Sequence, residues 1–333
     1  MKIIVTGGCG YVGSLLVPEL LELGHEVLVL DVQWFGNHLS EHPMLTVRNM
    51  DIRTVPSDWV GSEQVMALPT HYDAVIHLAA VANDPSADLD PSLAWEVNVL
   101  GTLNMLKAAK SMSARRFIYA SSGSVYGVSE AVSVNENTPL VPISLYNKTK
   151  MVAERLVKSF SDKLETVILR PGTLYGVSPR MRLDLMVNAL TCSAATKNLI
   201  TVDGGSQIRP ILHVQDMVRA YIWALNKYVA GPEVYNVSDQ NITAGEAAAR
   251  IGDLLDKVGG NVSIRIEPSN DPRSYRMDNS RILNAGFESV HGLDAGVMEV
   301  RNAIVQKLVV DDPICHNIRW MKNYVFVKDL GSV

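Results

Sequence analysis

Short apolar runs alternate with longer amphipathic segments over the first half of the chain. Runs rich in Val, Ile and Leu predict buried strands at residues 2–6, 26–31, 45–48, 73–78, 116–121 and 166–170. Apolar positions at helical spacing predict helices at residues 11–23, 92–112 and 146–161. Strands that alternate with helices in this way favour a parallel sheet covered by helices on both faces.

The pattern changes after Pro171. Prolines recur, apolar segments become shorter, and arginines become prominent at positions 180, 182, 209, 273, 276 and 281. We therefore predict an α/β fold in which residues 1–170 form a Rossmann-type, doubly wound domain and residues 171–333 mainly form a smaller lobe. Segments near 211–240 are expected to return to the sheet of the first domain. The last stretch, from about Asp311, mixes aromatic and polar residues and matches no motif.

The composition is that of a globular protein, with 47% hydrophobic and 20% charged residues among 333. The formal net charge of −5 disfavours nucleic acid as a partner. The three cysteines are too far apart to suggest a disulfide framework, and no metal site is predicted. No apolar run approaches the ~20 residues that span a bilayer, and we expect no signal peptide before the first strand. These features favour a cytoplasmic protein that does not act on membranes.

Glycines follow the first predicted strand at the spacing of a dinucleotide-binding loop. Gly8, Gly10 and Gly13 fit G-x-G-x-x-G, and Gly7, Gly10 and Gly13 fit G-x-x-G-x-x-G. A strand before the loop and a helix after it are required, because glycines let the backbone approach a pyrophosphate at the helix N-terminus. Asp31 ends the next strand, near the spacing of about 20 residues expected for the acid that binds the adenosine ribose. Because an acid there repels a 2′-phosphate, we predict NAD rather than NADP.

Tyr146 and Lys150 lie four residues apart in a predicted helix and therefore share one of its faces. A nearby ammonium favours the phenolate and can lower the pKa of a tyrosine by roughly 1–3 units from about 10. The pair therefore predicts a general base near neutral pH. Ser122 lies between the glycine loop and this pair, and the three elements together describe a hydride-transfer site.

With these motifs in this order, the chain resembles the extended short-chain dehydrogenase/reductases that act on nucleotide sugars, the NAD-dependent epimerase/dehydratase family. The resemblance runs from Lys2 to about Phe287. It implies that Asp51 and Ile52 meet the adenine, and that Asn98 holds backbone geometry rather than taking part in chemistry. The cofactor-binding residues predicted in this way are Gly7, Gly10, Tyr11, Val12, Gly13, Asp31, Asp51, Ile52, Leu78, Ala79, Ala80, Asn98, Ser121, Tyr146, Lys150 and Pro171.

The resemblance also implies a nucleoside-diphosphate sugar as the substrate. Ser122 lies where the family places its catalytic Ser or Thr, so Ser122, Tyr146 and Lys150 are the predicted catalytic residues. Arg209 can clamp a diphosphate with its planar guanidinium, and a surface ion pair is the alternative. The predicted substrate-binding residues are Ser122, Thr173, Arg182, Asn188, Arg209 and Arg273.

The resemblance leaves more than one reaction open. Family members that eliminate water carry an Asp-Glu pair after the catalytic hydroxyl, and the related decarboxylases usually carry a Glu at the second position. Gly123 and Ser124 stand there in this chain. We therefore predict epimerisation, in which a sugar carbon, most often C4, is oxidised and then reduced from the opposite face. A nucleotide-sugar dehydrogenase or a keto-sugar reductase would use the same residues.

Two alternatives come from other classes of protein. One is a non-catalytic NAD-binding sensor, which would need none of the three predicted catalytic residues. The other is a reductase of small carbonyl compounds, whose site would be apolar and without an arginine clamp. Thr173 replaces an asparagine found in many members, and the run from Ser178 to Asp184 resembles a subgroup that acts on unusual nucleotide sugars. Both departures fall where the sugar is expected, so base and sugar stay open.

The family commonly dimerises through two helices of each subunit. Residues 92–112 and 146–161 are the candidates here, because both segments are long and partly apolar outside the expected core stripe. We therefore expect a homodimer.

Overall fold

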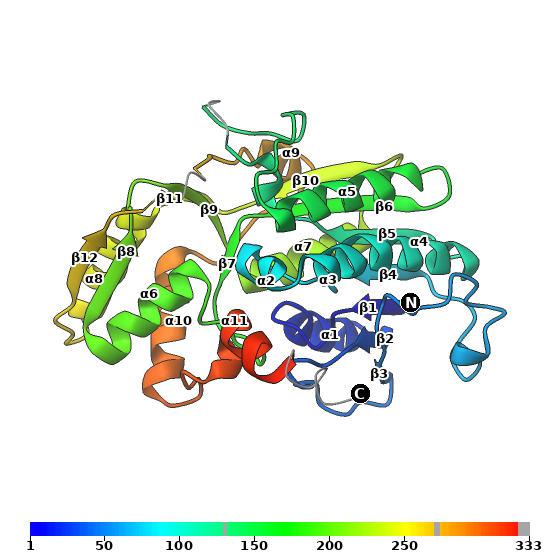
Figure 1. Cartoon of the computed structure of the whole chain (residues 1–333), viewed down its shortest axis with the longest axis horizontal. Helices are drawn as coiled ribbons and strands as arrows, with labels where there is room; N and C mark the ends of the chain where they lie inside the picture. Colours follow the sequence, from blue (N-terminus) through cyan, green and yellow to red (C-terminus); the bar gives the residue numbers. More distant parts are fainter. Residues whose placement is uncertain (129–131, 270–273, 326–333) are drawn as a thin grey trace.

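The structure is a computed structural model that describes residues 1–128, 132–269 and 274–325. Within these ranges, seven parallel strands form the central sheet in the order β10-β6-β5-β4-β1-β2-β3 (Figure 1). The strands are β1 (Lys2–Thr6), β2 (Glu26–Asp31), β3 (Leu45–Asn49), β4 (Ala74–His77), β5 (Arg116–Ala120), β6 (Glu165–Pro171) and β10 (Glu233–Val237). The strand order reverses between β1 and β4, and such a switch point leaves a crevice outside the carboxyl ends of the strands. The predicted doubly wound α/β fold is confirmed.

Helices bury both faces of this sheet. One face is covered by α4 (Thr102–Ser111) and α5 (Leu145–Ser159), and the other by α1 (Gly13–Glu22) and α7 (Val214–Asn226). Neighbouring residues of a strand point to opposite faces, so each inner strand contributes to two cores. Ile4 packs in the core on the α4 and α5 side, and Ile3 in the core on the α1 and α7 side. This double burial explains why the inner strands are continuous apolar runs.

The six predicted strands are all observed and differ from the prediction only at their ends. The predicted helix at 92–112 consists of α3 (Pro91–Trp95), a π-helical turn (Glu96–Gly101) and α4 in succession. The wide turn contains Asn98, whose side chain accepts from the backbone N–H of Val81 at 2.8 Å and donates to Thr149 at 3.0 Å. These bonds connect the loop that follows the inner strand β4 to helix α5, so Asn98 holds backbone geometry.

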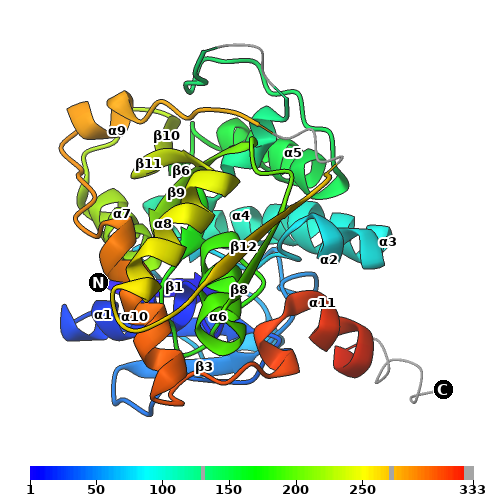
Figure 2. The same ribbon diagram turned by 90° about the vertical axis from the view of Figure 1, so that its left-hand side faces the viewer.

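The C-terminal lobe contains two small sheets and a core of its own (Figure 2). Its strands are β7 (Thr173–Tyr175), β9 (Ile208–His213) and β11 (Gln240–Thr243) in one sheet, and β8 (Leu199–Asp203) and β12 (Ser263–Glu267) in the other. Its main helices are α6 (Met186–Lys197), α8 (Ala244–Asp256) and α10 (Leu293–Val305). Between β9 and β11 the chain returns to the central sheet as α7 and β10.

Shorter elements complete the described chain. They are η1 (Glu63–Val65), α2 (Asp84–Leu89), η3 (Gly123–Tyr126), α9 (Ser280–Asn284), η4 (Pro313–Cys315), α11 (Asn317–Trp320) and η5 (Met321–Val325). Helix α11 lies at the red end of the chain in Figure 1 and packs against α2. The three cysteines are all buried and unpaired.

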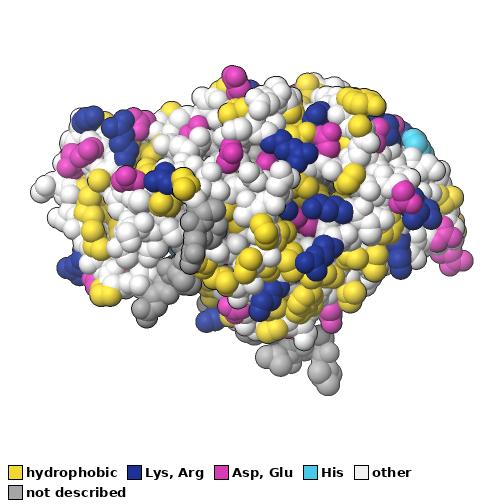
Figure 3. All heavy atoms as spheres, turned by 90° about the horizontal axis from the view of Figure 1, so that it is seen from above, with side chains coloured by type: hydrophobic (Ala, Val, Ile, Leu, Met, Phe, Trp, Pro, Cys, Tyr) yellow, Lys and Arg dark blue, Asp and Glu magenta, His cyan; other side chains and the backbone are white. Residues whose placement is uncertain are grey.

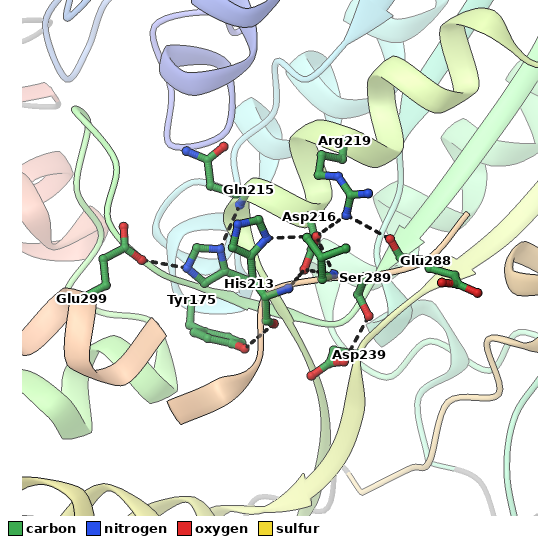
Figure 4. Close-up of polar contacts among 11 residues, drawn as sticks. Tyr175, His213, Gln215, Asp216, Arg219, Asp239, Glu288, Ser289 and Glu299 are labelled. Carbon is green, nitrogen blue, oxygen red and sulfur yellow. Dashed lines mark hydrogen bonds and ion pairs between the residues drawn. The ribbon is translucent and has the colours of Figure 1, made fainter. Parts of the chain in front are cut away.

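A polar cluster around the buried side chains of Asp216 and His213 joins the lobe to α7 (Figure 4). The carboxylate of Asp216, which is fully buried, accepts hydrogen bonds from the backbone and the side chain of His291 and from the side chain of Arg219. The His291 ring stacks on that of His213, whose Nε2 lies 2.8 Å from Oε2 of Glu299 on α10. Burial acts to raise the pKa of Asp216, but these hydrogen bonds prevail and lower it. His213 therefore serves the connection between the two parts.

The surface carries both signs of charge. Figure 3 shows Lys and Arg side chains interspersed with Asp, Glu and hydrophobic side chains on the face seen from above. Among the described helices, none is both long and apolar enough to cross a membrane. His, Cys, Asp and Glu side chains do not gather in threes as a metal site would require, as far as the described residues extend.

Candidate functional site

A cleft opens at the carboxyl ends of β1, β2, β4, β5 and β6 and extends to the beginning of the C-terminal lobe. It brings together most of the predicted site residues, although they are spread over more than half of the chain. The predicted residues that line it are Gly7, Gly10, Tyr11, Val12, Gly13, Asp31, Asp51, Ile52, Leu78, Ala79, Ala80, Ser121, Ser122, Tyr146, Lys150, Pro171, Thr173 and Arg182.

Among the described residues, three of those predicted are not part of this lining. Asn98 lies behind it, as described above. Asn188 is fully buried, where it accepts from the Gly176 N–H at 2.9 Å and donates to the Tyr11 hydroxyl at 3.2 Å. Arg209 lies on β9 outside the cleft lining. Arg273 lies outside the described residues.

The glycine loop is closely packed against the neighbouring strand end. Gly7 has φ +69°, and a Cβ added there would lie 2.7 Å from the backbone nitrogen of Ala79. A Cβ on Gly13 would lie 2.5 Å from the carbonyl oxygen of Gly7. Side chains are therefore excluded from both positions, and the loop leaves its backbone open toward the cleft at the start of α1. Such a helix N-terminus favours a phosphate group.

Asp31 is held at the end of β2 by backbone donors. The N–H groups of Cys9 and Gln33 donate to its two carboxylate oxygens at 3.0 and 2.7 Å. Burial raises the pKa of Asp31, while these two hydrogen bonds act to lower it. Burial also raises the pKa of the Cys9 thiol to about 12, so this thiol stays protonated at neutral pH. A glycine cradle with an acid at its rim fits the diphosphate and the adenosine ribose of NAD.

The three predicted catalytic side chains lie at one end of the cleft. Lys150 is buried, and its Nζ donates to the Ala120 carbonyl at 2.8 Å and lies 5.8 Å from the centre of the Tyr146 ring. Ser122 begins η3, where its Oγ accepts from the Ser124 N–H and contacts the Ser124 hydroxyl at 2.7 Å. One strand end and one helix thus provide all three groups.

The predicted lowering of the Tyr146 pKa by Lys150 is wrong for this ligand-free structure. Burial raises the Tyr146 pKa to about 12, and the charge of Asp84 adds to the rise, whereas Arg182 and Ser122 oppose it. Burial lowers the pKa of Lys150 to about 7, against the opposing charge of Glu154. For each group, desolvation outweighs the charges and hydrogen bonds that oppose it. The pair therefore rests as a neutral phenol beside an amine that titrates near pH 7.

A buried ion pair lies behind the catalytic end of the cleft, between α5 and β6. Glu154, one turn after Lys150 on α5, accepts from Arg170 Nε at 2.8 Å and from Arg170 Nη2 at 2.6 Å. Both side chains are 1% exposed. Glu154 also accepts from the Ser121 hydroxyl at 2.5 Å, and Arg170 donates to the Tyr126 hydroxyl at 2.8 Å. This network connects the ends of β5 and β6 to the helix that carries Tyr146 and Lys150.

His77 is a structural residue. Its two ring nitrogens lie 2.7 Å from the Thr6 hydroxyl and 3.0 Å from the Thr102 hydroxyl, and the ring is fully buried. Burial, together with the charge of Lys150, lowers its pKa to about 3. The imidazole therefore stays neutral and links β1, β4 and α4.

Several residues of the cleft were not predicted. Asn83 and Asp84 line the cleft together with Tyr146 and Arg182, and the charge of Asp84 acts on Tyr146. Arg182 makes a two-pronged ion pair with Asp184, with Nε–Oδ1 and Nη2–Oδ2 distances of 2.9 and 2.8 Å. Additional wall residues from distant parts of the chain are Trp34, Phe35, Ser124, Arg180, Tyr275 and Asn317. No local motif identifies Asn317, which reaches the cleft only because the C-terminal segment folds back on it.

Comparison with known proteins agrees with this geometry. Residues 3–238 match the NAD dependent epimerase/dehydratase family. A putative UDP-glucose 4-epimerase of Methanocaldococcus jannaschii is 30% identical over 90% of this chain and 97% of its own length. UDP-glucuronic acid decarboxylase 1 of Xenopus tropicalis is also 30% identical, over 89% of this chain and 70% of its own length. The crystal structure of UDP-glucose 4-epimerase from Thermotoga maritima with UDP-glucose superposes with a TM-score of 0.81, at 25% identity, over 93% of this chain and all of that one.

The matched residues 3–238 include all strands of the central sheet, apart from Lys2, and every predicted catalytic residue. The family that they match is NAD-dependent. The chain is therefore an enzyme of the NAD-dependent epimerase/dehydratase family, with NAD as its cofactor.

Proposed function

We propose that this enzyme is a nucleotide-sugar epimerase that oxidises a sugar carbon, most often C4, and returns the hydride to the opposite face. The observation that carries the proposal is the meeting of Ser122, Tyr146 and Lys150 in the NAD cleft, without an acid at positions 123 and 124. The named relatives that act as epimerases support it.

The space around Gly123 argues against elimination of water. A Cβ at this position would lie 2.2 Å from the terminal methyl of Met277 and 3.0 Å from the Pro171 carbonyl oxygen. A side chain at this position would therefore require the Met277 methyl to move away. Ser124, the next residue, directs its hydroxyl to the amide oxygen of Asn147 and contacts Ser122. Neither position supplies the general acid or base that elimination requires.

Two side chains act on the sugar hydroxyl that is oxidised. The Tyr146 oxygen accepts the proton of the sugar hydroxyl, and Ser122 donates a hydrogen bond to the same substrate oxygen. The charge of Arg182 and the hydrogen bond from Ser122 favour the phenolate that must form, against the raised pKa of the buried phenol. NAD, when bound, accepts the hydride from the same carbon and later returns it. Thr173, Arg182, Asn188, Arg209 and Arg273 stay our proposals for substrate contacts or their support.

The proposal is tested with a panel of UDP-, GDP-, CDP- and dTDP-sugars, NAD and the purified enzyme. Absorbance at 340 nm reports NADH, and chromatography with NMR reports the sugar configuration. We expect one sugar to change configuration without accumulation of NADH. The variant Tyr146→Phe should reduce this conversion by roughly 10²–10⁴-fold, the usual contribution of a general base. Steady NADH accumulation with a keto product would instead establish a dehydrogenase.

We also propose a homodimer through the helices at 92–112 and 146–161. Trp95 and Leu100, on the first of these segments, are 38% and 53% exposed. Large apolar side chains at that exposure fit a surface that a second subunit covers. Sedimentation at micromolar concentration tests this, and a monomer there would contradict it.

A further inference from the structure

Arg180 is a buried cation without a counter-charge in direct contact. Its side chain lines the cleft, and the residue is only 4% exposed. Its Nη2 donates to the neutral amide oxygen of Asn317 at 2.5 Å, and its guanidinium carbon lies 3.9 Å from the centre of the Phe35 ring. Nε is buried and has no hydrogen-bond partner among the residues that the structure describes. Within the described ranges, no carboxylate lies within ion-pair distance of this guanidinium.

The nearest acids are already engaged. The two oxygens of Asp31 accept backbone N–H groups. Arg180 interacts with Asp31 only through its charge at longer range, which acts to lower an Asp31 pKa that burial raises. The two oxygens of Asp184 accept the fork of Arg182, and one of them also accepts the Asn317 N–H at 3.3 Å. A buried charged donor left without an acceptor is costly, so such a group requires an explanation.

The position of Arg180 supplies that explanation. Its backbone N–H donates to the hydroxyl of Ser14 in the first turn of α1 at 3.4 Å. The glycine loop that begins α1 lines the same cleft, with its backbone open toward it. The backbone bond places residue 180 beside the first turn of α1, and the guanidinium and the glycine loop line one cleft, where both favour negative charge. A planar fork beside a row of N–H groups is an arrangement that binds a diphosphate.

We propose that Arg180 is an anion clamp for the diphosphate of NAD, and that Phe35 and Asn317 position it. Stacking on Phe35 fixes the plane of the guanidinium, and Asn317 holds one of its nitrogens. The unpartnered Nε is left to donate to a phosphate oxygen. The C-terminal segment that carries Asn317 thereby acquires a role in cofactor binding, which its sequence did not indicate. This proposal depends on NAD binding and not on which sugar is converted.

Binding of three probes to the nucleotide-free protein tests the clamp. ADP carries the adenosine and a diphosphate, adenosine lacks the diphosphate, and UDP carries a diphosphate with the base of a common sugar nucleotide. Arg180→Met should weaken ADP binding by about 10- to 100-fold in calorimetry, the range expected for loss of a charged hydrogen bond. Adenosine and UDP should bind as in the wild type. Arg180→Lys, which keeps the charge but loses the fork, should fall between the two.

Control variants separate the clamp from general effects of charge and folding. Arg250→Met removes a half-exposed arginine that pairs with Asp294 on the lobe, and should leave ADP binding unchanged. The melting temperature of ligand-free Arg180→Met should equal or exceed that of the wild type, because a buried unpaired charge is removed. A merely structural arginine would instead lower it. ADP should raise the melting temperature of Arg180→Met less than that of the wild type.

Asn317→Ala provides a second, independent measurement. If Asn317 acts through Arg180, its replacement should weaken ADP binding in the wild type and have little further effect in Arg180→Met. Equal weakening of ADP and adenosine by Arg180→Met would overturn the proposal, as would unchanged ADP affinity. Weakened UDP binding with unchanged ADP binding would also overturn it and assign the arginine to the substrate diphosphate.

Discussion

The buried pair of Glu154 and Arg170 gives the sharpest prediction about stability. Glu154→Gln keeps the shape of the side chain but leaves the Arg170 guanidinium in the protein interior without its counter-charge. Both side chains are 1% exposed, and two hydrogen bonds of 2.8 and 2.6 Å join them. Solvent therefore cannot replace the lost partner.

Removal of one partner from a buried ion pair costs about 3–5 kcal/mol, because the remaining charge stays desolvated. Total stabilities of folded proteins are about 5–15 kcal/mol, so this loss is a large fraction of the whole. With a urea dependence of about 3 kcal/mol per M, the unfolding midpoint should fall by about 1–2 M. Far-UV circular dichroism against urea, at fixed pH and with NAD absent, measures the shift.

Two further variants give the measurement its reference points. Asp294→Asn breaks the two-pronged pair with Arg250, in which both side chains are about half exposed, and should change the midpoint far less. The double variant Glu154→Met with Arg170→Met removes both charges and should recover most of the stability lost in Glu154→Gln. The reasoning would be refuted by a free energy of unfolding within about 1 kcal/mol of the wild type in Glu154→Gln. A double variant as unstable as the single one would refute it as well.

Three other outcomes follow from the structure. Asp31→Ala should bring the affinity for NADP closer to that for NAD in a titration with both cofactors, because the acid no longer repels the 2′-phosphate. Gly7→Ala should lower the melting temperature and weaken NAD binding, since its Cβ would lie 2.7 Å from the Ala79 nitrogen at a φ of +69°; unchanged values would contradict the close packing. The folded-state pKa of Asp216 is lowered, so its stabilisation is present above the unfolded pKa of about 3.9 and is lost as the pH falls through the folded value. Asp216→Asn should therefore flatten the acid limb of stability against pH in urea titrations.

The sequence was most informative where local chemistry determines structure. Buried parallel strands need continuous apolar runs, and the glycine loop needs residues without a Cβ, so both could be predicted from a few positions. The meeting of the three candidate catalytic side chains in one cleft could be predicted because Tyr146 and Lys150 share one helix, with Ser122 at a strand end. Their ionisation could not, because it depends on burial. Desolvation by the assembled fold raises the Tyr146 pKa to about 12 and lowers that of Lys150 to about 7.

The parts of the site that sequence missed come from chain segments that meet only in the folded protein. Asn317 and Phe35 lie far apart along the chain, and each carries a residue type that is common in unrelated places. What makes them informative is the single guanidinium that both contact. Asn188 was predicted as a substrate-binding residue, and its hydrogen bonds to Gly176 and Tyr11 likewise depend on segments that meet only in the fold.

The site concentrates buried charge that the free protein neutralises only in part. The Glu154–Arg170 pair is complete, and it stays below the cleft as a support. Arg180 has no such partner, and the Lys150 amine is so strongly desolvated that its pKa falls to about 7. Both side chains are buried but line the cleft, where a bound ligand can contact them. A bound diphosphate would supply a counter-charge for Arg180, and the phenolate formed at Tyr146 would supply one for Lys150. Ligand binding therefore adds stability that the free protein lacks. NAD should raise the melting temperature of the wild type more than that of Arg180→Met.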